Sequence, residues 1–388
     1  MNKVATRPHP KDLRNAAAPI DIAFSLPPAV YTSQQWYDRE VEQLFMHGWL
    51  VAAREEELPN PGDYLRVDFF GEPLVVIRGR DATIRTLSAT CRHRGSELLK
   101  GRGRCKAIVC PYHSWTYSLA GDLIGTPGMG EARDFHKEDY SLPKVRTETW
   151  GGFVFVNFDP NAESLLASLN NLPDRFAAYK LDEMVVTRKW ELDVAANWKV
   201  WVENSREGYH LGTVHRPSLE KYSPGYKLIP YTNAGVPGVY CMTTCNNEMG
   251  MMIPDNPLIP FIDGLTSADL DANHYVVMYP HFIFNLAPDR MALHQLFPLG
   301  PNRTKVVYWL CFPRSTTESA RFAEVSAEIY EPFDSFIPED HQICEAVQRG
   351  LQSRFAAPGR LSPGEEVTVH SFAEYLVGKM GNIPIEGA

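Results

Sequence analysis

Two short segments decide the fold of the first part of this chain: Cys91-Arg92-His93-Arg94-Gly95 and Cys110-Pro111-Tyr112-His113. Each contains one cysteine and one histidine, in the spacings C-x-H and C-x-x-H, and sixteen residues separate the two motifs. A thiolate and an imidazole from each of two loops form the ligand set of a [2Fe–2S] cluster in which two cysteines bind one iron and two histidines bind the other. Cys91 and Cys110 would then hold one iron, and His93 and His113 the second.

A structural zinc site is the alternative for these four residues, because two cysteines and two histidines also bind zinc. Zinc sites usually pair like ligands, whereas each loop here mixes a cysteine with a histidine. Gly95, Gly101 and Gly103 fit loops whose backbone wraps closely around inorganic sulfide and donates hydrogen bonds to it. Cys105 lies between the loops and is interpreted as a bystander, since both loops are already complete.

The segments around the two loops predict a small all-β domain over residues 49–159. Short runs of β-branched and aromatic residues alternate with Gly, Pro and Asp, at 64–70, 73–78, 108–109 and 152–158. The preceding residues, 1–48, contain five prolines before residue 29 and then an amphipathic pattern over 34–46. We therefore expect an N-terminal arm and helix that pack on the domain formed by residues 160–388.

Residues 160–388 mix helical and strand patterns and predict a second domain of the α+β type with an antiparallel sheet. Helices are expected over 199–211 and, as one long element, over 317–353. Strands are expected at 185–194, 239–244, 275–286, 294–299 and 305–312. The fold class of the whole chain is therefore α+β, with a small all-β domain first.

A second group of metal-ligand residues lies in the α+β domain: Glu207, His210 and His215. On a helix, Glu207 and His210 would share a face, and Gly212 and Pro217 would let the chain bend to bring His215 back. Two neutral imidazoles and one carboxylate form the facial triad of Fe(II) oxygenases, which leaves open positions for O₂. Alone, the H-x₄-H spacing is a weak signal, and a pair of surface histidines is the alternative.

Composition excludes several classes of function. The 388 residues carry a formal net charge of −9, which argues against nucleic acid or an anionic membrane surface as partner. We find no export signal and no apolar run that would cross a bilayer, and seven cysteines without a dense framework favour a reducing compartment, the cytoplasm. The chain has no dinucleotide fingerprint and no plant-type ferredoxin motif, so electrons for any redox reaction at these metals are expected from a separate flavin and ferredoxin reductase that uses NADH or NADPH.

The two cluster loops together with the downstream histidines resemble the α subunit of the Rieske non-heme iron oxygenases, the ring-hydroxylating oxygenase family. The resemblance extends from about residue 49 onward, and the run CPYHSWTYSLAGDL at 110–123 is similar to the second cluster loop of that family. Respiratory Rieske proteins carry an extra cysteine in each loop, where this chain has Ser96 and Tyr112. The resemblance implies a Rieske [2Fe–2S] domain, a helix-grip (START-like) catalytic domain, a mononuclear Fe(II), and O₂ and a small molecule as substrates.

The same resemblance implies a third iron ligand, a carboxylate on a late helix of the catalytic domain. Asp340, in the run FIPEDHQICEAVQRGLQS, is our choice. Glu339 and Asp334 are its competitors, and the alternative is that all three are solvated charges of a helix face.

The resemblance also assigns Glu207 a role as an electron-transfer bridge between subunits. In the family, subunits form a head-to-tail homotrimer, and the acidic residue three positions before the first iron histidine links a cluster histidine to an iron histidine of the neighbour. Glu207 would thus connect His113 of one subunit to His210 of the next. Most of the family has Asp at this position. The Glu in this chain resembles the branch of the family that oxidises quaternary ammonium compounds such as carnitine, glycine betaine and choline.

This branch implies N-demethylation of a quaternary amine with release of formaldehyde. Hydroxylation of an aromatic ring or demethylation of an aryl ether by the same machinery is the alternative, which an uncharged apolar pocket would favour. A quaternary ammonium group binds to aromatic faces. The aromatic candidates are Trp201, Tyr209, Tyr275, Tyr279, Phe282, Phe284 and Phe297. Because most aromatic residues fill cores, none of them is singled out and the substrate-binding residues stay unknown.

Overall fold

A computed structural model describes residues 13–220, 228–231, 240–246 and 257–380 of the chain. Contacts divide the chain into two compact units: Phe45–Asp174, called here the β unit, and Met1–Leu44 with Arg175–Ala388, called the α+β unit. The boundaries predicted at 48/49 and 159/160 stay predictions. No helix in the described ranges is both long and apolar enough to cross a bilayer.

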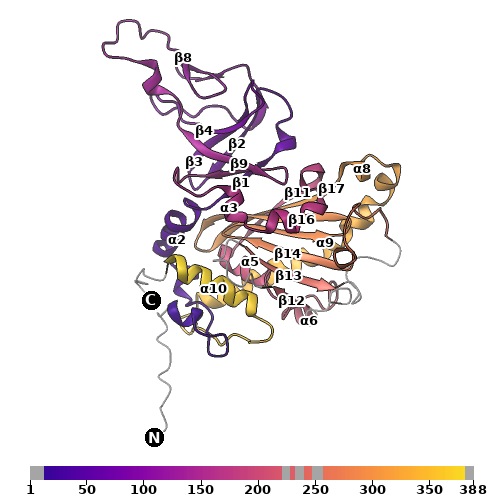
Figure 1. The fold of residues 1–388 in the computed structure, drawn as a ribbon. Helices are drawn as coiled ribbons and strands as arrows, with labels where there is room; N and C mark the ends of the chain where they lie inside the picture. Colours follow the sequence, from indigo (N-terminus) through magenta and orange to yellow (C-terminus); the bar gives the residue numbers. More distant parts are fainter. Residues whose placement is uncertain (1–12, 221–227, 232–239, 247–256, 381–388) are drawn as a thin grey trace. The chain divides into compact units, whose positions relative to one another are not determined.

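The β unit contains one seven-stranded and one three-stranded antiparallel sheet (Figure 1). The large sheet has the strand order β1-β10-β9-β4-β3-β2-β5. Its strands are β1 (Leu50–Arg54), β2 (Asp63–Phe69), β3 (Glu72–Arg78), β4 (Ile84–Ser88), β5 (Arg102–Arg104), β9 (Lys144–Trp150) and β10 (Phe153–Asn157). The small sheet consists of β6 (Ile108–Val109), β7 (Thr116–Tyr117) and β8 (Leu123–Gly125). The loop with Cys91 and His93 lies between β4 and β5 of the large sheet, and the loop with Cys110 and His113 lies between β6 and β7 of the small sheet, so the two sheets set where the loops lie.

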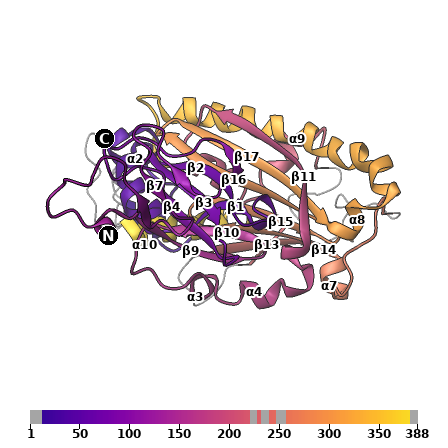
Figure 2. The same cartoon turned by 90° about the horizontal axis from the view of Figure 1, so that it is seen from above.

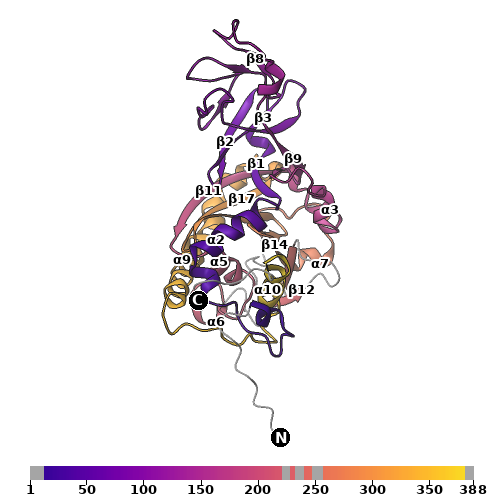
Figure 3. The ribbon, with the colours of Figure 1, turned by 90° about the vertical axis from the view of Figure 1, so that its left-hand side faces the viewer.

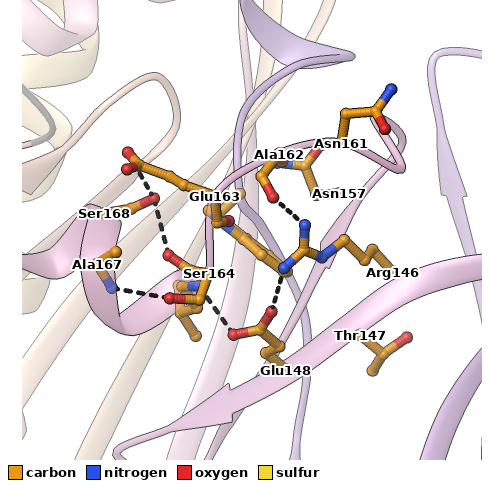
Figure 4. Close-up of polar contacts among 12 residues, drawn as sticks. Arg146, Thr147, Glu148, Asn157, Asn161, Ala162, Glu163, Ser164, Ala167 and Ser168 are labelled. Atoms are coloured by element: carbon orange, nitrogen blue, oxygen red, sulfur yellow. Dashed lines mark hydrogen bonds and ion pairs between the residues drawn. The ribbon is translucent and has the colours of Figure 1, made fainter.

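The last part of the β unit is fastened to strand β9 by a polar network (Figure 4). The Arg146 guanidinium contacts Glu148 at 2.9 Å and also donates to the carbonyl of Ala162. The second Glu148 oxygen accepts the N–H of Leu165 at 2.8 Å, at the start of helix α3 (Leu165–Leu169), and Ser164 caps that helix. This carboxylate satisfies a helix N-terminus that would otherwise lack a partner. The compact unit therefore continues past β10 to Asp174.

The α+β unit is built on a seven-stranded antiparallel sheet with the order β11-β17-β16-β15-β14-β13-β12. Its strands are β11 (Met184–Val194), β12 (Leu228–Tyr231), β13 (Tyr240–Asn246), β14 (Ala272–Met278), β15 (Phe282–Ala287), β16 (Arg290–Gly300) and β17 (Arg303–Pro313). The single strand predicted at 275–286 is wrong, because the chain turns at Tyr279-Pro280-His281 and forms the hairpin β14–β15. Proline cannot donate to a sheet ladder, which explains the break.

Helix α9 (Ala320–Leu351) confirms the long helix expected over 317–353. Its buried residues repeat at helical spacing: Phe322, Val325, Ile329, Phe333, Ile337, Cys344 and Gln348. Figure 2 shows α9 running alongside the sheet, near β11 and β17. The apolar face of this helix thus holds its remaining side chains, including those at 339 and 340, in fixed positions relative to the sheet.

The N-terminal segment joins the α+β unit through buried polar contacts. Helix α2 (Gln34–Glu40) and helix α5 (Trp198–Asn204) lie close together (Figure 3), and the fully buried pair Lys199–Glu40 joins them at 2.6 Å. Tyr31 donates to Glu203 at 2.6 Å. Burial raises the pKa of Glu203 to about 7. Because each buried charge has a partner, these contacts fix α5 firmly, and α5 leads directly into the metal-ligand segment.

Candidate metal centres

The two loops of the β unit bring His93 and His113 together. Their ring centroids lie 4.8 Å apart, and the Nδ1 atom of each ring is buried without a hydrogen-bond partner among the described residues. Cys91 and Cys110 are buried and free. A buried ring nitrogen without a partner costs free energy unless another group satisfies it, so two such atoms beside two buried thiols fit a ligand set.

The protein surrounds the two cysteine sulfurs with hydrogen-bond donors. Burial alone would raise the pKa of the Cys110 thiol, but the backbone N–H groups of Tyr112 and His113, with other donors, outweigh burial and lower it. The Tyr117 hydroxyl lies 3.3 Å from Cys91 Sγ and accepts the N–H of Arg92 at 3.0 Å. Because the Tyr117 oxygen accepts the N–H of Arg92, the Tyr117 hydroxyl proton is available to Cys91 Sγ. The loops are therefore prepared to hold thiolates.

Aromatic packing fixes the two imidazole rings. His93 stacks on Trp115 at a centroid distance of 4.7 Å, and His113 stacks on Tyr112 at 3.7 Å. Burial lowers the pKa of His113, and the neighbouring His93 and Arg94 side chains lower it further, which favours the neutral imidazole. A neutral ring nitrogen is the form that binds metal.

The second candidate centre begins where helix α5 ends. The continuous helix predicted over 199–211 is wrong, because α5 stops at Asn204 and the short helix α6 (Leu211–Val214) follows. At this break the Glu207 side chain accepts the backbone N–H of His210 at 3.0 Å, immediately before the new helix, so this N–H is satisfied without a continuous helix. His210 and His215 occupy the two ends of α6, which directs both rings to the same place.

The structure brings His210, His215 and Asp340 into one group. One possible ligand atom from each lies within 4.8 Å of the others. Asp340 Oδ1 lies 2.9 Å from His215 Nε2 and 3.6 Å from His210 Nε2, so both Nε2 atoms converge on one carboxylate from α9. This donor set, two imidazoles and one carboxylate, is the one that non-heme Fe(II) prefers.

Two further carboxylates hold the outer nitrogens of these histidines. His210 Nδ1 donates to Glu207 at 2.6 Å, and His215 Nδ1 donates to Glu339 at 2.7 Å. Ser218 donates to the same Glu339 oxygen at 2.5 Å. Sequence reasoning treats Glu339 only as a competing ligand and misses this orienting contact. The other competitor, Asp334, is exposed and pairs with Arg188 at 2.6 Å, away from the group.

The electrostatics of the group favour a bound cation. Burial alone would lower the pKa of His210, but its hydrogen bonds to Asp340 and Glu207 outweigh burial and raise it to about 9. Burial alone would raise the pKa of Asp340, but hydrogen bonds from both histidines lower it to about 2. Without metal, the carboxylates therefore retain protons on the imidazoles, and a divalent cation would supply the same positive charge.

A cavity opens beside this group within the α+β unit. One side is formed by the 204–219 segment and another by Phe333 and Phe336 of α9. The sheet contributes the floor, which consists of Tyr275, Ile283, Asn285, Ala292 and His294. Tyr275 is the one of the seven aromatic candidates from the sequence that lines this cavity. The other two described aromatic lining residues, Phe333 and Phe336, are not among those candidates.

The comparisons with known proteins agree with this geometry. Residues 48–144 match the family model of the Rieske [2Fe-2S] domain, and residues 181–382 match that of the ring hydroxylating alpha subunit (catalytic domain). The carnitine monooxygenase oxygenase subunit of Acinetobacter pittii is 30% identical over 92% of this chain and 94% of its own length. The glycine betaine monooxygenase oxygenase subunit of Pseudomonas aeruginosa is 26% identical over 93% of this chain and 90% of its own length.

A solved structure is also similar over nearly the whole chain. It is that of a quaternary ammonium Rieske monooxygenase, with a TM-score of 0.78 and 28% identity, covering 96% of this chain and 98% of the other. The chain therefore belongs to the ring-hydroxylating alpha subunits of the Rieske non-heme iron oxygenases. It is an oxygenase with a Rieske [2Fe–2S] cluster and a mononuclear iron, so the predicted family, fold class and cofactors are confirmed and the zinc alternative is wrong.

Proposed function

We propose that this chain is the terminal oxygenase of a multicomponent system that N-demethylates a small quaternary ammonium compound of the betaine or carnitine type. The observation that carries the proposal is the group His210, His215 and Asp340 at the wall of a cavity with aromatic residues. The named relatives act on carnitine and glycine betaine and match over most of their length. Aromatic faces bind quaternary ammonium groups, and Tyr275, Phe333 and Phe336 supply them.

The four loop residues Cys91, His93, Cys110 and His113 would hold the cluster. His210, His215 and Asp340 would hold the mononuclear iron. When bound, the cluster passes single electrons and the Fe(II) ion activates O₂ for attack on a substrate C–H bond.

The chain's own residues then position the reaction. Glu207 and Glu339 fix which nitrogen of each imidazole faces inward. The cavity would place one N-methyl group of the substrate beside His210, His215 and Asp340. Hydroxylation of that methyl gives a carbinolamine, which releases formaldehyde. One O₂, two electrons and two protons are consumed, and one water is formed.

The two electrons must enter through the cluster from a separate reductase that uses NADH or NADPH. Glu207 is the proposed bridge, from His113 of one subunit to His210 of its neighbour in a homotrimer. Its position supports this role, because one Glu207 oxygen already accepts from His210 Nδ1 at 2.6 Å. Each carboxylate oxygen has a second lone pair for another donor. Five free cysteines in the described ranges favour a reducing compartment, which we infer to be the cytoplasm.

An aromatic substrate is the second candidate, because the same three aromatic side chains and Ile283 could hold an uncharged ring. Single-turnover kinetics separates the candidates. Iron-loaded protein is reduced chemically without reductase and mixed with O₂ and, in turn, carnitine, glycine betaine, choline or simple aromatic compounds. Fast cluster oxidation with one quaternary amine alone supports the proposal. Fast oxidation only with an aromatic compound overturns it in favour of the second candidate.

A further inference from the structure

The cavity floor carries two nitrogen-bearing polar side chains, Asn285 and His294, beside Tyr275, Ile283 and Ala292. In the strand register, Tyr275, Asn285 and Ala292 are paired across β14, β15 and β16, and the next row pairs Ile283 with His294. Asn285 and His294 are therefore diagonal neighbours on the same face, a relation that places side chains about 7–8 Å apart. Both line the cavity.

His294 is held in one tautomer. The Trp201 indole Nε1–H donates to His294 Nδ1 at 3.5 Å, and the His294 ring packs on Tyr308 at a centroid distance of 4.0 Å. Because an indole nitrogen only donates, Nδ1 must accept, and the ring proton then belongs to Nε2. Trp201 does not line the cavity, so the ring edge opposite Nδ1 is the edge that can face it.

The same ring is neutral at ordinary pH, because burial lowers the pKa of His294 to about 4. A neutral donor can bind an oxygen of the substrate without placing a second positive charge beside a quaternary ammonium group. The one Lys or Arg side chain among the described lining residues is Arg206, which is only 1% exposed and thus offers the cavity almost no surface. The floor therefore offers His294 and Asn285 as uncharged hydrogen-bond donors to a ligand.

From this geometry we propose that His294 donates its Nε2–H to the carboxylate of a zwitterionic quaternary ammonium substrate, with Asn285 as the second polar contact. This inference rests on the proposed function and adds to it the group that recognises the anionic end. His294 is then a specificity-determining residue, which separates betaines from quaternary amines without a carboxylate.

The test compares two ligands that differ in the carboxylate. Dissociation constants for glycine betaine, or carnitine where it binds more tightly, and for tetramethylammonium are measured by calorimetry without O₂, on iron-loaded protein with the oxidised cluster. The variant His294→Phe keeps an aromatic ring on Tyr308 and removes the donor. His294→Gln retains an N–H donor and serves as the conservative variant.

The expected result is that His294→Phe weakens binding of the carboxylate substrate about 10- to 100-fold, the range for losing a hydrogen bond to a charged group, with tetramethylammonium affinity unchanged. His294→Gln should recover part of this loss. Equal weakening for both ligands, or no weakening, overturns the role of His294 and leaves the proposed function standing. Failure of the wild-type protein to bind any carboxylate-bearing quaternary amine overturns both.

Discussion

The contact between His215 and Glu339 gives the sharpest prediction about the iron site. Glu339 accepts from His215 Nδ1 at 2.7 Å and from Ser218 at 2.5 Å, so it holds the ring with Nε2 toward Asp340. Both donors use the same Glu339 oxygen, so Glu339→Gln can keep an acceptor there, but it removes the negative charge that raises the basicity of the His215 ring. Loss of a carboxylate behind a metal-binding histidine typically weakens metal affinity about 10- to 100-fold, or about 1.4–2.8 kcal/mol.

The assay is titration of Fe(II), without O₂, into protein that has been freed of its mononuclear iron but retains its cluster. Asp334→Asn is the matched control, because Asp334 lies on the same helix but is exposed and paired with Arg188. We expect the control to bind Fe(II) within about twofold of wild type, since an exposed ion pair is worth little. Wild-type Fe(II) affinity in Glu339→Gln, with cluster absorbance intact, would refute the role of the Glu339 carboxylate charge behind His215.

Three further predictions address the metals and the pH dependence. Asp340→Ala should empty the mononuclear site and leave the visible absorbance of the cluster unchanged, as measured by iron content and spectroscopy; loss of the cluster as well would contradict two independent centres. Burial lowers the pKa values of His274 and His281 to about 4 in the folded protein. Between about pH 6.5 and pH 4 these histidines therefore bind protons in the unfolded chain but not in the folded one. The free energy of unfolding should be highest above about pH 6.5 and should fall as the pH is lowered toward about 4. Each histidine should lower the free energy of unfolding by up to about 3 kcal/mol at pH 4. Denaturant titrations of iron-loaded protein between pH 7 and 4.5 would measure this fall, and a constant free energy of unfolding would contradict the buried neutral state. Tyr117→Phe removes a hydrogen bond to a cluster sulfur and should lower the midpoint potential by about 50 mV in voltammetry, whereas an unchanged potential would mean that the hydroxyl does not donate.

The sequence predicted the cluster loops well because their ligands are local. Cys91 and His93 are two residues apart, and Cys110 and His113 are three apart, so spacing alone carries the signal. The long helix at 317–353 was also predictable, since its buried residues repeat at helical spacing over 32 residues of α9. Asp340 could be chosen only by resemblance, because nothing local separates it from Glu339.

What the sequence could not predict depends on contacts between distant segments or on side chains competing with backbone. The helix expected through 199–211 stops at Asn204, and the Glu207 carboxylate accepts the backbone N–H of His210, a contact that periodicity does not reveal. The role of Glu339 depends on His215, 124 positions earlier in the chain. The cavity floor depends on strand register, which pairs Ile283 with His294 and could not be read from either segment alone.

The measurement that tests the central claim most directly is formaldehyde formed in a single turnover by wild-type protein and by Asp340→Ala. Both proteins would carry a chemically reduced cluster, and both would be mixed with O₂ and the quaternary amine that triggers cluster oxidation. The proposed function predicts formaldehyde from the wild type and none from Asp340→Ala, whose cluster stays reduced. Equal formaldehyde from the two proteins, or none from either, would contradict N-demethylation at the site formed by His210, His215 and Asp340.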